Sequence, residues 1–207
     1  RHISTSRVET ALTRAVYVPE MEEVTTLQGA GTLTRTDDGR YRVRFVRAFD
    51  RPVEDLWAAI SEPELLDTWY PAKLRTSGVV GEPVTEEFES TDGTPPPETP
   101  PGVLTAYEPP RLFAFRVDGI PDSPYPGMRG RQDITMEATP GSSDDECVLT
   151  FTHDVQTLES ALSVLPGWHY CLEYLALTMG TQGEPTEENL ERLKAHYQER
   201  YGGGLND

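Results

Sequence analysis

Five short β-forming segments follow one another between residues 84 and 153, with no helical segment between them. They cover residues 84–89, 103–108, 112–117, 131–138 and 147–153. Two of the joints, at residues 108–111 and 140–143, are short turn clusters rich in Pro, Gly and Ser. Consecutive strands with short joints favour an antiparallel meander over alternating βαβ units. A sheet with one apolar face must be covered by another layer, so the other segments have to supply helices.

A further pair of strands is predicted ahead of this meander. Residues 31–36 and 41–49 are rich in β-forming residues and are joined by an Asp-Asp-Gly turn at 37–39. This turn suits a hairpin because Asp and Gly tolerate positive φ. Apolar residues and arginines alternate from Tyr41 to Phe45, which is typical of a strand with one buried and one solvent-exposed face.

Two short helices are predicted after the hairpin. The first has an apolar stripe at helical spacing. The stripe consists of Val53, Leu56, Trp57 and Ile60. Asp50 is the expected N-cap, and Pro52 suits the first turn. A second short helix starts around Pro63, carries Trp69 and stops before Pro71.

The last part of the chain returns to a helical pattern. Residues 165–179 predict an apolar-faced helix that Gly180 ends. Its apolar face holds Leu165, Trp168, Leu172, Leu175 and Met179. A final helix is expected over residues 186–201, with Thr186 as N-cap and Asn189 where a capping box prefers Glu or Gln.

The charge balance argues against two classes of partner. The 207 residues include 18 basic and 35 acidic side chains, a net charge of −17. Such a surface repels phosphate backbones and anionic headgroups, so no nucleic-acid partner is expected. No apolar run approaches the ~20 residues of a membrane helix, so no membrane insertion is expected.

The compartment and the domain organisation follow from length and cysteine usage. A chain of this length can bury roughly 70% of its unfolded surface without disulfides. Cys147 and Cys171 are therefore expected to be free thiols, although the two could also pair. With no secretory signal at the start, the predicted location is cytoplasmic. We divide the chain into a weakly patterned segment at 1–28, one domain at 29–180, and a C-terminal helix with a flexible tail at 181–207.

Three sequence motifs, in this order, resemble a known family. They are Pro-Val-x-x-x-Trp at 52–57, Glu-Pro-Pro-Arg-Leu at 108–112 and Gly-Trp-His at 167–169. Together with the surrounding residues 29–180, they resemble the SRPBCC (START-like) superfamily, and within it the Hsp90 ATPase activator homologue branch. The chain departs from the usual short members by two proline-rich segments, at 91–101 and 118–130. Long loops of this kind are either lids over a site or variable insertions.

The resemblance implies an α+β helix-grip fold of the START and Bet v 1 type. In this fold a curved antiparallel sheet wraps around a long C-terminal helix, and two short helices lie alongside. One helix covers the sheet incompletely, which leaves an apolar cavity suited to a small molecule. The residues expected to line it are Trp69, Phe88, Phe113, Phe115, Met136, Phe151, His153, Trp168, Leu172, Leu175 and Met179. Each of them can equally be ordinary core, since apolar stripes usually pack.

Polar candidates are few. His153 and His169 could exchange protons near neutral pH, or could be hydrogen-bonded structural histidines. The cysteines and histidines lack the spacing of a zinc site, so no metal and no cofactor is expected. Glu86, Glu87 and Glu89 could supply a carboxylate, but charges that alternate along a strand of so acidic a protein are interpreted as its solvated face.

Three functions remain open. The first is binding of a hydrophobic or aromatic small molecule, such as a polyketide-like natural product or a lipid, by a carrier, sensor or sequestering protein. Some relatives protect enediyne producers by being cleaved in place of DNA, so a resistance role is included. The second is an enzyme like the polyketide aromatase/cyclases of the superfamily, with Tyr107, Arg116 and His153 as polar participants. The third is a co-chaperone. Hsp90 is not expected as a partner, because residues 1–28 are too few for the extra domain of the activators.

Overall fold

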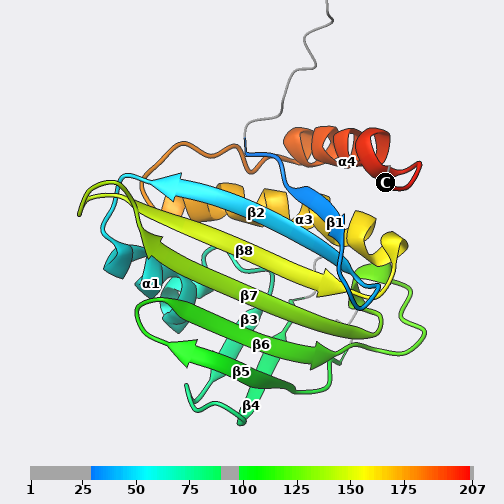
Figure 1. The fold of residues 1–207 in the computed structure, drawn as a ribbon, viewed down its shortest axis with the longest axis horizontal. Coiled ribbons are helices and arrows are strands. Elements are labelled where there is room, and N and C mark those ends of the chain that lie inside the picture. Colours follow the sequence, from blue (N-terminus) through cyan, green and yellow to red (C-terminus); the bar gives the residue numbers. More distant parts are fainter. Residues whose placement is uncertain (1–28, 90–97, 206–207) are drawn as a thin grey trace, which may run out of the picture.

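The computed structural model describes residues 29–89 and 98–205. An eight-stranded antiparallel sheet, in the order β1-β2-β8-β7-β6-β5-β4-β3, lies against one long helix, α3 (Figure 1). The strands are β1 (Thr32–Arg35), β2 (Tyr41–Phe49), β3 (Lys73–Thr76), β4 (Pro83–Glu87), β5 (Gly102–Glu108), β6 (Leu112–Asp118), β7 (Arg131–Pro140) and β8 (Cys147–Val155). The helices are α1 (Val53–Ser61), α2 (Pro63–Leu66), the 3-10 turn η1 (Pro126–Met128), α3 (Leu158–Thr178) and α4 (Glu187–Tyr201). The predicted α+β helix-grip fold is confirmed.

Strands β2 and β8 pair along their whole length. Their register runs without interruption from Tyr41 opposite Val155 to Phe49 opposite Cys147. Phe45 and Phe151, which are opposite each other, are both fully buried under α3. A slip of one strand by one residue would turn its phenylalanine to the solvent side, so the apolar pattern sets the register.

Helix α3 begins earlier than the sequence pattern predicted. Its first residue is Leu158, and the Thr157 hydroxyl accepts a hydrogen bond from the backbone N–H of Ser160 at 3.0 Å. Pro166 therefore lies inside the helix, although Pro is usual in a first turn. The prediction that the helix starts at 165 is wrong, because an N-cap and a buried Ala161 upstream extend the apolar face.

Two other local predictions are wrong. The N-cap of α1 is Pro52, which cannot supply a capping oxygen from its side chain, and not Asp50. Strand β3 was not predicted, because its four residues are mostly polar and carry no clear alternation. It pairs with β4 from Lys73 opposite Glu87 to Thr76 opposite Val84. This pairing completes the edge of the sheet.

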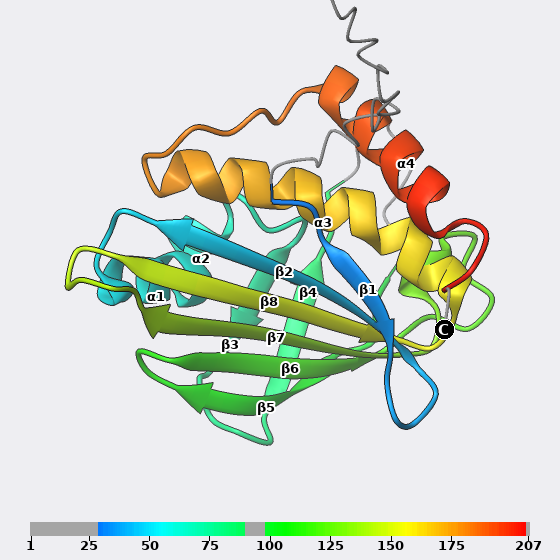
Figure 2. The same ribbon diagram turned by 45° about the horizontal axis from the view of Figure 1, so that its top comes forward.

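Helix α4 packs on the side of α3 that faces away from the sheet (Figure 2). Tyr197 is buried, and its hydroxyl accepts a hydrogen bond from the backbone N–H of Gly31 at 2.7 Å. The same hydroxyl is hydrogen-bonded to Nδ1 of His169 at 2.8 Å. Tyr201 accepts a further hydrogen bond from the N–H of Leu33 at 3.3 Å. These contacts connect α4 both to α3 and to the first strand.

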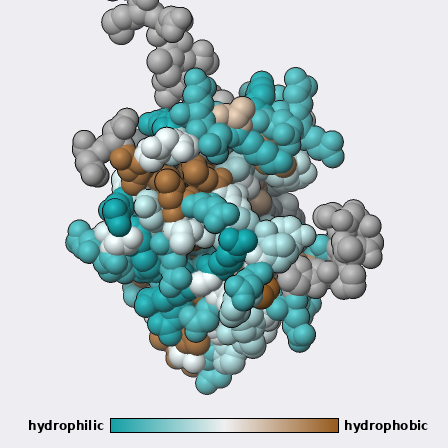
Figure 3. Space-filling model, turned by 90° about the vertical axis from the view of Figure 1, so that its right-hand side faces the viewer, coloured by the Kyte–Doolittle hydropathy of each residue, from teal (hydrophilic) through white to brown (hydrophobic). Residues whose placement is uncertain are grey.

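The exterior differs sharply from the interior. On the face shown in Figure 3, most of the surface is hydrophilic, and hydrophobic residues gather in a few patches. Within residues 29–89 and 98–205, no helix combines the length and apolar character that crossing a membrane requires. Most of the large apolar side chains of these residues are instead buried in one core cluster, to which the sheet and the helices contribute.

Candidate ligand-binding site

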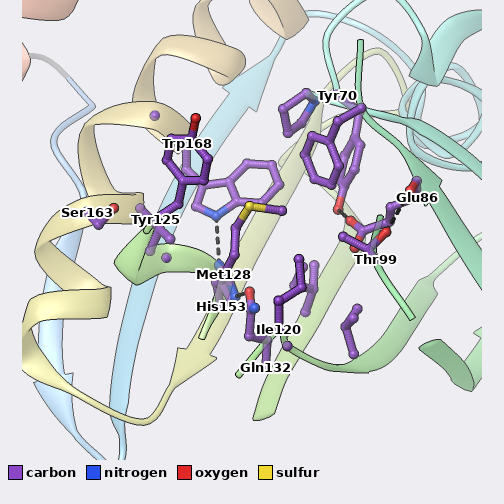
Figure 4. Close-up of a pocket in the computed structure, with 18 of the residues that line it drawn as sticks. Tyr70, Glu86, Thr99, Ile120, Tyr125, Met128, Gln132, His153, Ser163 and Trp168 are labelled. Atoms are coloured by element: carbon purple, nitrogen blue, oxygen red, sulfur yellow. Dashed lines mark hydrogen bonds between the residues drawn. The ribbon is translucent and has the colours of Figure 1, made fainter. Parts of the chain in front are cut away.

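A cavity of about 290 Å³ lies between α3 and the half of the sheet formed by β4, β6, β7 and β8. Its walls come from α3, these strands, the segment after α2, and both proline-rich loops (Figure 4). The lining residues are Tyr70, Pro71, Glu86, Phe88, Thr99, Pro100, Val117, Gly119, Ile120, Tyr125, Gly127, Met128, Gln132, Ile134, His153, Ser163, Val164, Gly167, Trp168 and Cys171. Its volume is near the lower end of the ~300–1,000 Å³ range of small-molecule sites.

The space is open at one end of the helix because α3 presents small side chains there. A Cβ atom added to Gly167 would meet no heavy atom within 4 Å, although this residue lines the cavity. Further along the same helix, Leu172 and Leu175 are fully buried and lie outside the cavity. The helix therefore fills the sheet's concave face along one half and leaves it unfilled along the other.

The loop at 118–130 is part of the cavity wall. The Ser160 hydroxyl of α3 donates a hydrogen bond to the carbonyl oxygen of Pro126 at 2.8 Å. Gly127 packs so closely that an added Cβ would lie 2.6 Å from Cγ1 of Val164. This anchoring places Tyr125 and Met128 over the cavity. The described end of the other loop also contributes, through Thr99 and Pro100.

His153 occupies the centre of a buried hydrogen-bonded chain. The indole Nε1–H of Trp168 donates to Nδ1 of His153 at 2.8 Å. Because Nδ1 accepts, the neutral imidazole carries its proton on Nε2, which donates to Oε1 of Gln132 at 2.9 Å. Burial lowers the pKa of His153 from 6.5 to about 4. Its two nitrogens are thus both occupied and the ring is neutral, so it supports the wall and does not exchange protons there.

A second polar group lies on another part of the wall. The hydroxyl of Tyr70 donates a hydrogen bond to Oε1 of Glu86 at 2.7 Å. Burial raises the pKa of Glu86, and the hydrogen bond from Tyr70 opposes this rise. The interpretation of Glu86 as a solvated strand residue is wrong. Val84, two residues earlier in β4, is buried. Because alternate side chains of a strand lie on the same face, Glu86 shares the inward face of β4 with Val84.

The other reactive side chains are poorly suited to chemistry. Cys171 lines the cavity, but burial raises the pKa of its thiol to about 12. Both cysteines are free, as predicted. Among the residues that the structure describes, no three His, Cys, Asp or Glu side chains come together as metal ligands would. His169 lies outside the cavity, hydrogen-bonded to Tyr197.

Three of the predicted lining residues line the cavity: Phe88, His153 and Trp168. The others are buried in the packed core outside it. They are Trp69, Phe113, Phe115, Met136, Phe151, Leu172, Leu175 and Met179. Trp69 donates its indole N–H to the carbonyl oxygen of Ala59 at 2.8 Å and so joins the turn after α2 to α1. Its neighbour Tyr70 lines the cavity in its place.

The two remaining polar residues considered for catalysis also lie elsewhere. Tyr107 packs edge-on against Trp57 and Phe113, with ring centroids 5.4 and 5.8 Å away. Neither Tyr107 nor Arg116 lines the cavity. Two polar residues that do line it, Gln132 and Glu86, had a detectable signal in the sequence. Each shares the face of its strand with buried apolar residues two positions away.

Comparison with known proteins supplies the family. Residues 40–198 match the family described as polyketide cyclase/dehydrase and lipid transport. The chain therefore belongs to this family, and the predicted SRPBCC superfamily is confirmed. Comparison with curated proteins gives no significant match.

Several solved structures share the fold at low sequence identity. The crystal structure of CalU16 from Micromonospora echinospora is 17% identical, with a TM-score of 0.60 over 84% of this chain and 95% of CalU16. A protein from Bordetella parapertussis is 20% identical, with a TM-score of 0.56 over 84% of this chain and 92% of its own. DynU16, from the dynemicin biosynthetic locus, is 18% identical, with a TM-score of 0.51 over 70% of this chain and 50% of DynU16. At these identities the likeness concerns the fold alone.

Proposed function

We propose that this protein binds a compact apolar or aromatic small molecule in the cavity, as a carrier, sensor or sequestering protein. The observation that carries the proposal is an unfilled, mostly apolar cavity with a few fixed polar groups, which is the usual form of a small-molecule site. The family's description, which names polyketide chemistry and lipid transport, supports an apolar ligand. The volume of about 290 Å³ favours a molecule of a few rings over a long-chain lipid.

The test uses native mass spectrometry of the purified protein, followed by a thermal-shift screen of aromatic polyketides, lipids and sterols. A true ligand at 100 times its Kd adds ~2.7 kcal/mol of stability. A compound that is retained or stabilises the fold is the expected result. A protein that stays empty and responds to none of these compounds would contradict the proposal.

A matched pair of glycine variants makes the test specific to the cavity. In Gly167→Leu the new side chain would occupy the open space, and replacing a helical Gly favours the helix by up to about 1 kcal/mol. This variant should fold and should lose ligand binding. Gly203→Leu serves as the control, because Gly203 is exposed, lies outside the cavity and has the same free space around its Cβ position. Equal binding by both variants would locate the ligand elsewhere.

A second candidate function is a cavity-based enzyme such as an aromatase/cyclase. The pair of Glu86 and Tyr70 favours it, since a buried carboxyl group whose pKa is raised by burial is a suitable general acid or base. Such an enzyme should convert a linear polyketone into a cyclised product, and Glu86→Gln should abolish turnover. Binding of the polyketone without any product would leave the carrier function as the better account.

Three finer assignments stay predictions. They are the Hsp90-activator-homologue branch within the superfamily, a self-resistance role and a cytoplasmic location.

A further inference from the structure

Two side chains on separate parts of the cavity wall offer hydrogen bonds of opposite polarity. Gln132 comes from β7 and Glu86 from β4, and each side chain already has one oxygen committed to a protein donor (Figure 4). What remains of each side chain is a single polar group at the cavity. The identity of that group follows from the hydrogen bonds already made.

The orientation of the Gln132 amide is set by Trp168. Indole N–H can only donate, so the bond of 2.8 Å from Trp168 makes Nδ1 of His153 an acceptor. Nε2–H of His153 must then donate, so the amide oxygen of Gln132 is the atom 2.9 Å away. Within residues 29–89 and 98–205, the amide NH2 of Gln132 has no hydrogen-bond partner. Since Gln132 lines the cavity, it presents a donor there.

Glu86, as a carboxylate, presents the opposite polarity. Its Oε1 accepts the hydroxyl of Tyr70, and no other described residue hydrogen-bonds to Oε2. Neither this oxygen nor the Gln132 amide is among the fully enclosed polar atoms that lack a partner. Both atoms are therefore open to a molecule in the cavity. Each would go unpaired if a purely apolar ligand displaced its water, which would weaken binding by roughly 5- to 150-fold per group.

We infer that the ligand is polar at both ends: a compact ring system whose carbonyl oxygen accepts from the Gln132 amide and whose hydroxyl donates to Glu86. The inference rests on the proposed function and names the ligand's chemistry within it. The two side chains lie three strands apart in the sheet, roughly 14 Å along a flat sheet. Their inward reach and the sheet's curvature shorten the gap between the polar atoms. Two fused rings with oxygens at opposite ends suit this gap.

Four bicyclic compounds of nearly equal size provide the probes. They are 6-hydroxy-1-tetralone, 1-tetralone, 5,6,7,8-tetrahydro-2-naphthol and tetralin, which carry both groups, the carbonyl alone, the hydroxyl alone and neither. Isothermal titration with the wild-type protein should rank the first compound at least tenfold tighter than tetralin. The two single-group compounds should fall between them, since one net hydrogen bond strengthens binding by about 2- to 12-fold.

Two substitutions exchange the polarity of one group each while keeping the existing protein hydrogen bond. Gln132→Glu keeps an oxygen for Nε2–H of His153 but replaces the donor with an acceptor. This variant should lose the preference for 1-tetralone over tetralin and keep the preference for the hydroxyl. Glu86→Gln keeps an oxygen for Tyr70 but replaces the acceptor with a donor. That variant should lose the hydroxyl preference and keep the preference for the carbonyl.

The outcomes separate this inference from the proposed function. The wild-type protein could bind all four compounds equally and lose all of them in Gly167→Leu. This result would overturn the polar assignment but still support ligand binding in the cavity. Selectivity that neither polarity exchange alters would also overturn it. Binding of none of the four would count against both. The wild-type series needs no variant, so the inference remains refutable if a substitution prevents folding.

Discussion

Lowering the pH from about 6.5 to about 4 should destabilise the protein through His153. Burial holds the folded-state pKa of His153 at about 4, whereas an unfolded chain keeps the ordinary value of about 6.5. Between these two values the unfolded chain binds a proton that the folded protein does not, so each step down in pH favours unfolding. The full effect, reached below the folded-state pKa, is about 3 kcal/mol, and it is absent above the unfolded pKa.

Urea denaturation at several pH values between 4 and 8 measures this effect by comparing the wild-type protein with His153→Leu. At pH 7 the variant should be less stable by about 1–3 kcal/mol, because Trp168 and Gln132 lose their partner. As the pH falls through the window, that difference should shrink by about 3 kcal/mol. His169 and His196 also have lowered pKa values, mainly through burial, but both remain in the two proteins. A difference that stays constant with pH, or a His153 ring that titrates near 6.5 by NMR, would refute the reasoning.

Three more substitutions test other parts of the structure. Leu172→Trp should lower the free energy of unfolding by about 1–3 kcal/mol or more, because Leu172 is fully buried in packed core outside the cavity. A variant that keeps its stability but no longer binds ligand would show that Leu172 lines the site. Gly127→Val should weaken ligand binding by at least tenfold with little change in melting temperature, because the new side chain would clash with Val164 and push the loop away from α3. Unchanged affinity in a binding titration would show that the loop does not contact the ligand. Tyr197→Phe should cost about 1–3 kcal/mol in urea denaturation by leaving the buried N–H of Gly31 and Nδ1 of His169 without their shared partner; a loss below the measurement error would show that water replaces the hydroxyl.

The N-terminal hairpin, the antiparallel meander of the later strands and the long C-terminal helix could be predicted because each depends on local patterns. Alternation in β2 and β8 specifies which face is buried, and short turns between the later strands leave only an antiparallel meander. The exact start of α3 could not be predicted, since Pro166 imitates a first-turn signal that the upstream cap at Thr157 overrides. Strand β3 was missed because its pairing with β4, and not its own composition, makes it a strand.

The candidate site was less accessible to sequence reasoning. Apolar residues on one face of α3 look alike in the sequence, yet Trp168 lines the cavity while Leu172 and Leu175 fill the core. Which part of a helix leaves space depends on the distance to the opposite strands, and that distance is a property of the assembled layers. Glu86 was assigned to solvent because charged strand residues usually are exposed.

The sequence by itself determined the class of fold, the superfamily and the apolar character of the interior, since these follow from periodicity, turn chemistry and ordered motifs. Only the tertiary structure decided where the interior is unfilled and which polar atoms face the space. The donor on Gln132 is defined by Trp168, thirty-six positions away in the chain, through the ring of His153. These hydrogen bonds form only where α3, β8 and β7 come together in the folded protein, so no local pattern of residues predicts which atom of Gln132 is the free donor.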